Sequence, residues 1–309
     1  MDKTQFPFAA IVGQEKMKKA LLLNLINPRI GGLLIKGEKG TAKSTIVRAA
    51  AQLLPELNVI ELPLGATEDK VVGTLDIEQA IKKGEKKFEA GILAKADNNI
   101  LYVDEVNLLE DHIVDILLDV AAMGVNTVER EGISYSHPSR FILIGTMNPE
   151  EGDLRPQLLD RFGLTLDVIG ESDVESRIEI MKRRLAFEAD PEQLINDYAE
   201  EQNKLTRIIL KAREKLADIT CPENLYELIA KLSVNVGVDG HRADIIILKT
   251  AITLACYYQK NEVSDSDIYE AAELVLPHRL HRLPFDEKEL SADKLREMIY
   301  NINNTLALN

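Results

Sequence analysis

Short apolar runs alternate with amphipathic stretches over the first half of the chain. The apolar runs are rich in Ile, Val, Leu and Tyr, as buried strands are, and cover residues 32–36, 58–63, 99–105, 140–148 and 164–169. Stretches with apolar residues at helical spacing lie between most of these runs, at 43–54 and 109–123. This alternation predicts an α/β fold whose core is a mostly parallel sheet with helices on both faces. Two β-prone arms around residues 130–132 also predict a hairpin over 124–138.

The pattern changes to helices alone after about residue 172. Apolar residues then recur at helical spacing in one stretch after another. Pro222 and Asp265–Asp267 stand where two of these helices should begin. We therefore expect two domains, an α/β domain over residues 1–172 and a smaller, all-helical domain over residues 173–309.

Composition and charge narrow the class of protein. The chain has 309 residues, of which 45% are hydrophobic and 28% charged, so we expect a globular protein with a real core. It contains no run of about 18 apolar residues and no basic stretch followed by an apolar core near its start, so neither a membrane span nor a secretion signal is expected. Cys221 and Cys256 form no metal-ligand pattern, which fits the cytoplasm. The net charge of −14 argues against nucleic acid as the main partner.

A candidate phosphate-binding loop, "GEKGTAKST", lies between the first apolar run and the first helix-like stretch. Backbone N–H groups of such a loop can surround phosphate oxygens, Lys43 would reach the terminal phosphates, and Ser44 would bind Mg²⁺. The usual pattern has glycine where this chain has Ala42, but alanine costs nothing there if its φ is negative. The alternative is an ordinary strand–turn–helix junction. The predicted nucleotide-binding residues of the loop are Gly37, Glu38, Lys39, Gly40, Thr41, Ala42, Lys43, Ser44 and Thr45.

Polar side chains follow two of the later predicted strands. Asp104 and Glu105 come directly after an apolar strand, and adjacent carboxylates there are costly unless they are used. Asp104 would bind Mg²⁺, and Glu105 would orient or deprotonate a water molecule. Asn148 ends the next strand and would position the same water. The alternatives are a helix-capping pair for the carboxylates and a turn residue for Asn148.

This combination resembles the AAA+ ATPases, and more closely the ATPase subunit I family of magnesium chelatase. The resemblance runs from about residue 6 to 282 and is most specific between 60 and 165. It is carried by "FPFAAIVGQE", "GEKGTAKST", the segment from "LPLGATED" to "ILYVDEVNLL", "GTMNPEEGDLRPQLLDRFGL" and "GHRADI". Ala42 departs from the glycine that many members have in the loop.

The resemblance implies a ring, which we expect to be a hexamer, with ATP and Mg²⁺ bound between subunits. It implies that Val12, Gly13 and Gln14 lie beside the adenine and that the helical domain is a lid. Arg161 would be an arginine finger, a residue that reaches the γ-phosphate of the neighbouring subunit's ATP, with Arg155 as a second candidate. Without the resemblance, each would be a surface salt bridge. Arg242 in "GHRAD" would contact the nucleotide bound to its own chain.

The function implied is that of an ATP-hydrolysing motor. It would drive partner subunits that insert a metal ion into a tetrapyrrole, including a companion subunit with an integrin-like domain. The charged insertion over residues 65–91 is expected to carry an extra helix and to face partners. Two alternatives remain open, a MoxR-like chaperone ATPase acting on metalloproteins and a nucleotide-binding scaffold without turnover; a DNA-remodelling ATPase fits the acidic charge less well. His278 and His281 have a spacing that suits a metal, although ordinary lid structure accounts for them too.

Overall fold

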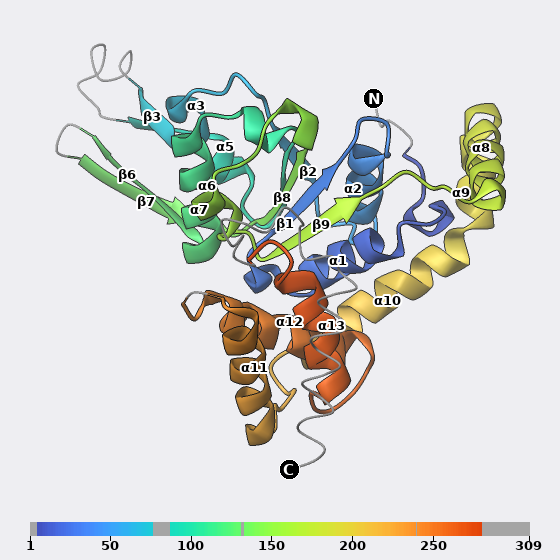
Figure 1. Ribbon diagram of the computed structural model, residues 1–309. Coiled ribbons are helices and arrows are strands. Elements are labelled where there is room, and N and C mark those ends of the chain that lie inside the picture. Colours follow the sequence, from blue (N-terminus) through green and yellow to red (C-terminus); the bar gives the residue numbers. More distant parts are fainter. Residues whose placement is uncertain (1–4, 77–86, 131–132, 239, 280–309) are drawn as a thin grey trace.

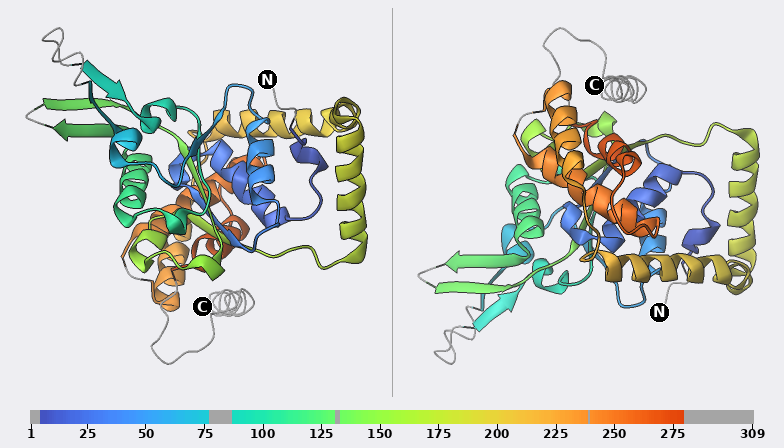
Figure 2. Two further views of the ribbon diagram at one scale, coloured as in Figure 1. Left: turned by 90° about the horizontal axis from the view of Figure 1, so that it is seen from above. Right: turned by 90° about the horizontal axis from the view of Figure 1, so that it is seen from below.

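The computed structural model describes residues 5–76, 87–130, 133–238 and 240–279. An α/β domain carries the phosphate-loop segment and lies against a group of helices from the later part of the chain (Figure 1). One helix of that later part, α8, stands away from both groups (Figure 2).

The centre of the α/β domain is a five-stranded sheet in the order β2-β5-β8-β1-β9. All neighbouring strands are parallel, as the alternating pattern predicts. Each of the five predicted runs forms one of these strands: β1 (Leu33–Gly37), β2 (Val59–Leu62), β5 (Ile100–Val103), β8 (Ile142–Met147) and β9 (Leu164–Val168).

Side chains of the strands point alternately to the two faces of the sheet, and most strands contribute to an apolar core on each face. In β1, Leu33 and Ile35 belong to one core and Leu34 to the other. The first core also holds α1 (Glu15–Ile26) and α2 (Lys43–Ala51). The second holds the helices of the opposite face: α3 (Glu68–Val72), α5 (Ile92–Lys95), α6 (Asp111–Met123) and α7 (Pro156–Leu159). Short 3₁₀ turns cover Phe8–Ala10, Pro28–Ile30, Val106–Leu108 and Pro149–Glu151.

Two antiparallel strand pairs extend from one side of the α/β domain (Figure 1). The pair β6 (Val125–Arg130) and β7 (Ile133–Pro138) confirms the predicted hairpin, although residues 131–132 of its turn lie outside the described residues. The other pair, β3 (Gly73–Asp76) and β4 (Lys87–Ala90), belongs to the charged insertion. The rings of Phe88 and Tyr135 stack with centroids 4.0 Å apart and join the two pairs. The insertion over residues 65–91 also holds α3, and its residues 77–86 lie outside the described residues, so the extra helix expected in it stays a prediction.

In the described residues after β9, the regular elements are helices alone, as predicted: α8 (Val174–Ala189), α9 (Pro191–Asp197), α10 (Ala199–Lys215), α11 (Glu223–Val236), α12 (Arg242–Tyr257) and α13 (Asp265–Val275). Buried residues of α10 and α12 share the first apolar core with α1 and α2. A domain division at 172/173 stays a prediction. Within the described ranges, no helix combines the length and the apolar character that crossing a membrane requires.

Candidate active site

The predicted phosphate loop connects the end of β1 to the start of α2. Gly40 has a φ of 85°, a left-handed conformation that suits glycine. Ala42 is also left-handed, with φ 57° and ψ 20°. The expectation that alanine costs nothing here required a negative φ and is therefore wrong, because the Cβ of a left-handed residue crowds its own carbonyl at a cost of about 1–2 kcal/mol. The loop keeps its shape with strain at Ala42.

The amine of Lys43 is folded into the loop. It donates to the carbonyl oxygens of Gly37 and Glu38, the second at 2.9 Å. Burial lowers the pKa of Lys43, while the carboxylates of Asp104 and Glu105 act in the opposite direction. A partly buried cation facing carboxylates across a small pocket is an arrangement that bound phosphate and Mg²⁺ would complete.

A pocket of about 300 Å³ joins the loop to the polar residues that follow the strands. The strands β5, β8 and β1 are neighbours, so their carboxyl ends meet at one edge of the sheet. The lining residues are Lys39, Gly40, Thr41, Ala42, Lys43, Ser44, Asp104, Glu105, Thr146, Met147 and Asn148. The structure thus brings together most of the predicted loop with all three predicted strand-end residues.

Asp104 is held in a fixed orientation. Its Oδ1 accepts hydrogen bonds from the hydroxyls of Tyr102, at 2.9 Å, and Thr146, at 2.5 Å. The Thr146 hydroxyl in turn accepts the backbone N–H of Glu105 at 3.3 Å. The Ser44 hydroxyl and the Asp104 carboxylate line the same pocket and are hard oxygen donors, so they fit a Mg²⁺ ion that takes its other ligands from phosphate and water. Sequence reasoning missed Thr146, although it stands in the quoted "GTMN".

Glu105 combines an unusual backbone with a cationic neighbour. Its φ of 52° and ψ of 54° are left-handed. The amine of Lys39 lies 3.8 Å from the Glu105 carboxylate and 2.5 Å from that of Glu151. Hydrogen bonding to Glu151 raises the pKa of Lys39, which therefore stays charged. Lys39 thus connects the predicted base to a second carboxylate that sequence reasoning did not single out.

Asn148 follows β8 and is 4% exposed. Its Oδ1 accepts the backbone N–H of Glu150 at 3.3 Å and so caps the short turn that follows. It therefore acts as a turn residue and as a pocket residue at once, and the two interpretations made from the sequence are compatible.

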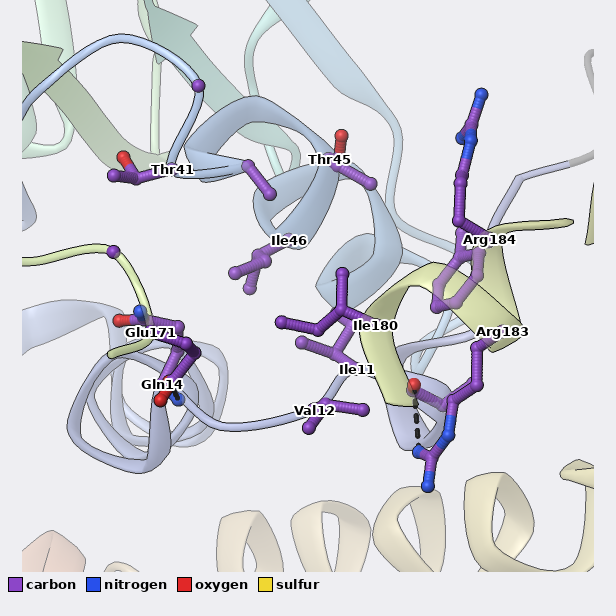
Figure 3. Close-up of a pocket in the computed structure, with 15 residues that line it drawn as sticks. Ile11, Val12, Gln14, Thr41, Thr45, Ile46, Glu171, Ile180, Arg183 and Arg184 are labelled. Atoms are coloured by element: carbon purple, nitrogen blue, oxygen red, sulfur yellow. Dashed lines mark hydrogen bonds between the residues drawn. The ribbon is translucent and has the colours of Figure 1, made fainter. Parts of the chain in front are cut away.

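A second pocket, of about 250 Å³, lies on the other side of the loop and shares Gly40, Thr41 and Ala42 with the first. The side chains of Ile11, Val12, Ile46 and Ile180 surround it (Figure 3). The predicted Val12 and Gln14 line this pocket, as does Thr45. Gly13, with a φ of 68°, turns the chain between Val12 and Gln14. An apolar space beside a phosphate loop can take a nucleobase.

Two elements of this second pocket were not predicted. The Glu171 carboxylate accepts the backbone N–H of Gln14 at 3.1 Å and so ties the segment after β9 to the start of α1. Helix α8 contributes Ile180, Arg183 and Arg184, and Arg183 donates to the carbonyl of Ala10 at 3.0 Å (Figure 3). These contacts join residues more than 150 positions apart, and no local pattern signals them.

The three predicted arginines do not line either pocket. Arg161 pairs with Asp115 and Asp119 of α6, and Arg155 pairs with Asp111. β9 begins with Leu164 beside Leu33, the first residue of β1. Arg161 therefore precedes the amino end of its strand, whereas the loop follows the carboxyl end of β1.

Arg242 lies with Arg161 and away from the loop of its own chain. Its guanidinium donates to Asp160 Oδ2 at 3.1 Å, one residue before Arg161. The expected contact between Arg242 and the nucleotide of the same chain stays a prediction.

The histidine pair considered as a metal site is explained differently. His278 is half-buried and shares a 3.3 Å hydrogen bond with the carbonyl of Phe162 through Nε2. Burial, with a smaller contribution from the charge of Arg279, lowers the pKa of His278 well below its usual value. His281 lies outside the described residues.

Comparison with known proteins places the chain among ATPases. Residues 32–162 match the AAA domain of the dynein-related subfamily, and residues 226–298 match the AAA lid domain. The chain is 53% identical to a magnesium-chelatase subunit ChlI homolog of Methanocaldococcus jannaschii, over 95% of this chain and 90% of that protein. It is 46% identical to the magnesium-chelatase 38 kDa subunit of Rhodobacter capsulatus, over 91% and 90% respectively.

A solved structure supports the same placement. The chain is similar, at 44% identity and a TM-score of 0.54, to a chain in the complex between subunits BchI and BchD of magnesium chelatase; the match covers 96% of this chain and all of that one. Fold and site together define a P-loop ATPase of the AAA+ class, with a parallel sheet core and a helical lid. Within that class, the chain belongs to the ATPase subunit I family of magnesium chelatase.

Proposed function

We propose that the chain is the ATP-hydrolysing motor subunit of a magnesium-chelatase-like complex. The observation that carries this proposal is the single pocket in which Lys43 and Ser44 face Asp104, Glu105 and Asn148. A scaffold that only bound nucleotide would not need a carboxylate held in a left-handed backbone beside the phosphate site.

Each residue has a defined part in the proposed reaction. The loop N–H groups and Lys43 bind the phosphates, and Ser44 and Asp104 hold Mg²⁺. Bound Mg²⁺ would neutralise charge on the phosphate being transferred. Glu105 accepts a proton from the attacking water, and Asn148 orients that water. The apolar pocket beside Val12, Gly13 and Gln14 holds the adenine.

The proposed assembly is a ring, a hexamer in our proposal, in which Arg161 completes the site of a neighbouring subunit. Support comes from the sheet: four residue steps of β1 separate the level of Leu164 from that of Gly37, a span of about 13 Å at strand spacing. Arg161 is therefore remote from its own loop. The two are proposed to meet across an interface.

The proposed partners are companion chelatase subunits, including one with an integrin-like domain, that insert a metal ion into a tetrapyrrole in the cytoplasm. The names of the relatives and the BchI–BchD complex support this part. It is tested by adding such companion subunits and measuring ATP turnover and metal insertion. An ATPase that neither binds nor responds to them would favour the chaperone alternative.

The test of the chemistry is Glu105→Gln, which keeps size and hydrogen bonding but removes the base. We expect ATP binding with Mg²⁺ to persist while turnover falls by roughly 10²–10⁴. Glu110→Gln, at an exposed side chain five residues on, is the matched control and should hydrolyse ATP normally. Normal turnover in Glu105→Gln would refute the proposed base, and no turnover in any form, even with partners, would favour the scaffold.

A further inference from the structure

Arg279 is a buried cation in the turn that follows α13. Its side chain is 1% exposed. Burial lowers its pKa to about 10 in spite of the nearby Asp160 carboxylate, so it stays charged at neutral pH. A buried charge is costly unless it is paired and fully hydrogen-bonded. The segment that carries its hydrogen-bond partners is therefore the segment that Arg279 holds in place.

Nearly all of these partners belong to one short segment, Asp160–Gly163, which carries Arg161. The Arg279 guanidinium donates to the backbone carbonyls of Asp160 at 2.8 Å, Phe162, and Gly163 at 3.2 Å. It also donates to Asp160 Oδ1 at 3.1 Å. Its remaining partner is the carbonyl of Val275 at 2.7 Å, at the end of α13.

The segment has little regular structure of its own. It follows α7, a helix of four residues, and precedes the first residue of β9. A helix this short is not stable by itself. Buried carbonyls need a hydrogen-bond partner, and Arg279 supplies one on each side of Arg161. The lid therefore fixes the backbone from which Arg161 projects.

Asp160 of this segment also joins Arg279 to Arg242. Asp160 accepts Arg279 through Oδ1 and Arg242 through Oδ2. The side chain of Arg161 is 20% exposed and directed at Asp115 and Asp119. A shift of the lid that moved Arg279 would therefore move the base of the Arg161 side chain relative to α6.

We propose that Arg279 is a positioning residue for the arginine finger: its guanidinium couples the lid to the Asp160–Gly163 backbone and so sets where Arg161 stands at the neighbouring subunit's ATP. The inference rests on the proposed function of Arg161. Arg279 itself touches neither nucleotide pocket, so its effect is confined to sites that Arg161 completes.

The first test is a double-mutant cycle on ATP turnover with Arg279→Met and Arg161→Ala. Arg279→Met should lower kcat by roughly 10², the cost of a misplaced catalytic group, and leave KM for ATP unchanged. The double variant should turn over no more slowly than Arg161→Ala alone, because both changes remove the same contribution. Arg213→Met is the matched control: Arg213 also donates to a core carbonyl, that of Leu25 at 2.9 Å, but not to this segment.

The second test asks whether Arg279→Met loses the arginine side or the phosphate-loop side of the shared ATP site. Arg279→Met keeps a sound phosphate loop, so mixing it with Lys43→Ala should restore part of the activity, and mixing it with Arg161→Ala should not. If Arg279→Met does not fold, Arg279→Lys, which keeps the charge but not the planar fork, takes its place in both tests.

Three outcomes would overturn the proposal: normal kcat in Arg279→Met, a double variant whose defects multiply, or recovery with both partners alike. Normal ATP turnover in Arg161→Ala would instead show that Arg161 is not an arginine finger, and the proposed role of Arg279 would then fail with it. The failures of the two ideas are therefore distinguishable.

Discussion

At the scale of single residues, backbone strain is concentrated where the chemistry is proposed. Five non-glycine residues in the described part of the chain have a positive φ, and Gln14, Ala42 and Glu105 are three of them. Such conformations persist only where the surrounding structure imposes them, and they occur disproportionately at functional sites. The strain at Ala42 and Glu105 is consistent with a pocket whose shape is fixed before the nucleotide arrives.

Ala42→Gly should make the protein more stable. Glycine adopts a left-handed φ without a Cβ penalty, so we expect the free energy of unfolding to rise by about 1 kcal/mol. Urea denaturation measures it. Ala186→Gly, at an exposed position inside α8, is the control and should lower stability by about 0.5–1 kcal/mol, since glycine weakens a helix. A loss of stability in Ala42→Gly would contradict the strain assigned to this residue.

His278 should make folding sensitive to acid. Its pKa is depressed in the folded protein, and its Nδ1 is buried without a hydrogen-bond partner. Below about pH 6.5 the unfolded chain takes up a proton that the folded chain resists, so stability is complete above that pH and falls as the pH drops. Thermal melts from about pH 7 to about pH 5 should show a smaller decline in His278→Gln than in the wild type.

The exposed His112 provides the control for this pH series. His112→Gln should follow the wild-type decline. An equal decline in His278→Gln would mean that other groups are responsible for the acid sensitivity.

At the scale of elements, α8 has two different faces. Ile180 and Arg183 line the apolar pocket beside the phosphate loop. Val174, Met181 and Leu185 are 68%, 58% and 66% exposed, on the helix that stands away from the rest of the molecule (Figure 2). A helix with so few packed neighbours depends on its contacts with the pocket for its position.

Ile180→Ser should weaken nucleotide binding. Removing an apolar wall that the adenine would cover costs about 1 kcal/mol, which is roughly five- to tenfold in Kd. Titration with a fluorescent ATP analogue measures the change. Met181→Ser, the next residue on the same helix and outside the pocket, should bind as the wild type does. Equal affinities in both variants would show that α8 does not contact the base.

The sequence was informative where function depends on neighbours along the chain. The order strand, loop, helix around Lys43, and the carboxylates that end β5, follow from local patterns, and so do all five strands of the sheet. The φ of Ala42 is set by the folded loop and cannot be read from the residue type. The contacts of Arg279 with Asp160–Gly163, of Ile180 with the pocket and of Arg242 with Asp160 join distant segments, so no periodicity could signal them.

At the scale of the whole molecule, the phosphate loop and Arg161 lie at opposite ends of the neighbouring strands β1 and β9. In the proposed ring, each ATP site therefore needs a loop from one subunit and an arginine from the next. An arginine finger contributes about 10³–10⁵ in rate, so a subunit that lacks either part should be nearly inactive.

Mixing Lys43→Ala with Arg161→Ala should restore part of the ATPase activity. Some interfaces in the mixture pair a sound loop with a sound arginine, although each protein alone lacks one of them. Subunit exchange, checked by labelling, is the necessary control. Full activity of Arg161→Ala alone, in normally sized assemblies, would reject action across the interface.

The separation of loop and arginine along β1 and β9 also gives the subunit a polarity. In the proposed ring, a head-to-tail contact joins two different surfaces, so every subunit would supply a residue to one neighbour and receive one from the other. If Arg161 acts as proposed, an open chain of subunits would leave one loop without its arginine, and a lone subunit would have no complete site. ATP turnover per subunit should therefore rise with protein concentration and reach a plateau only when the subunits form closed rings.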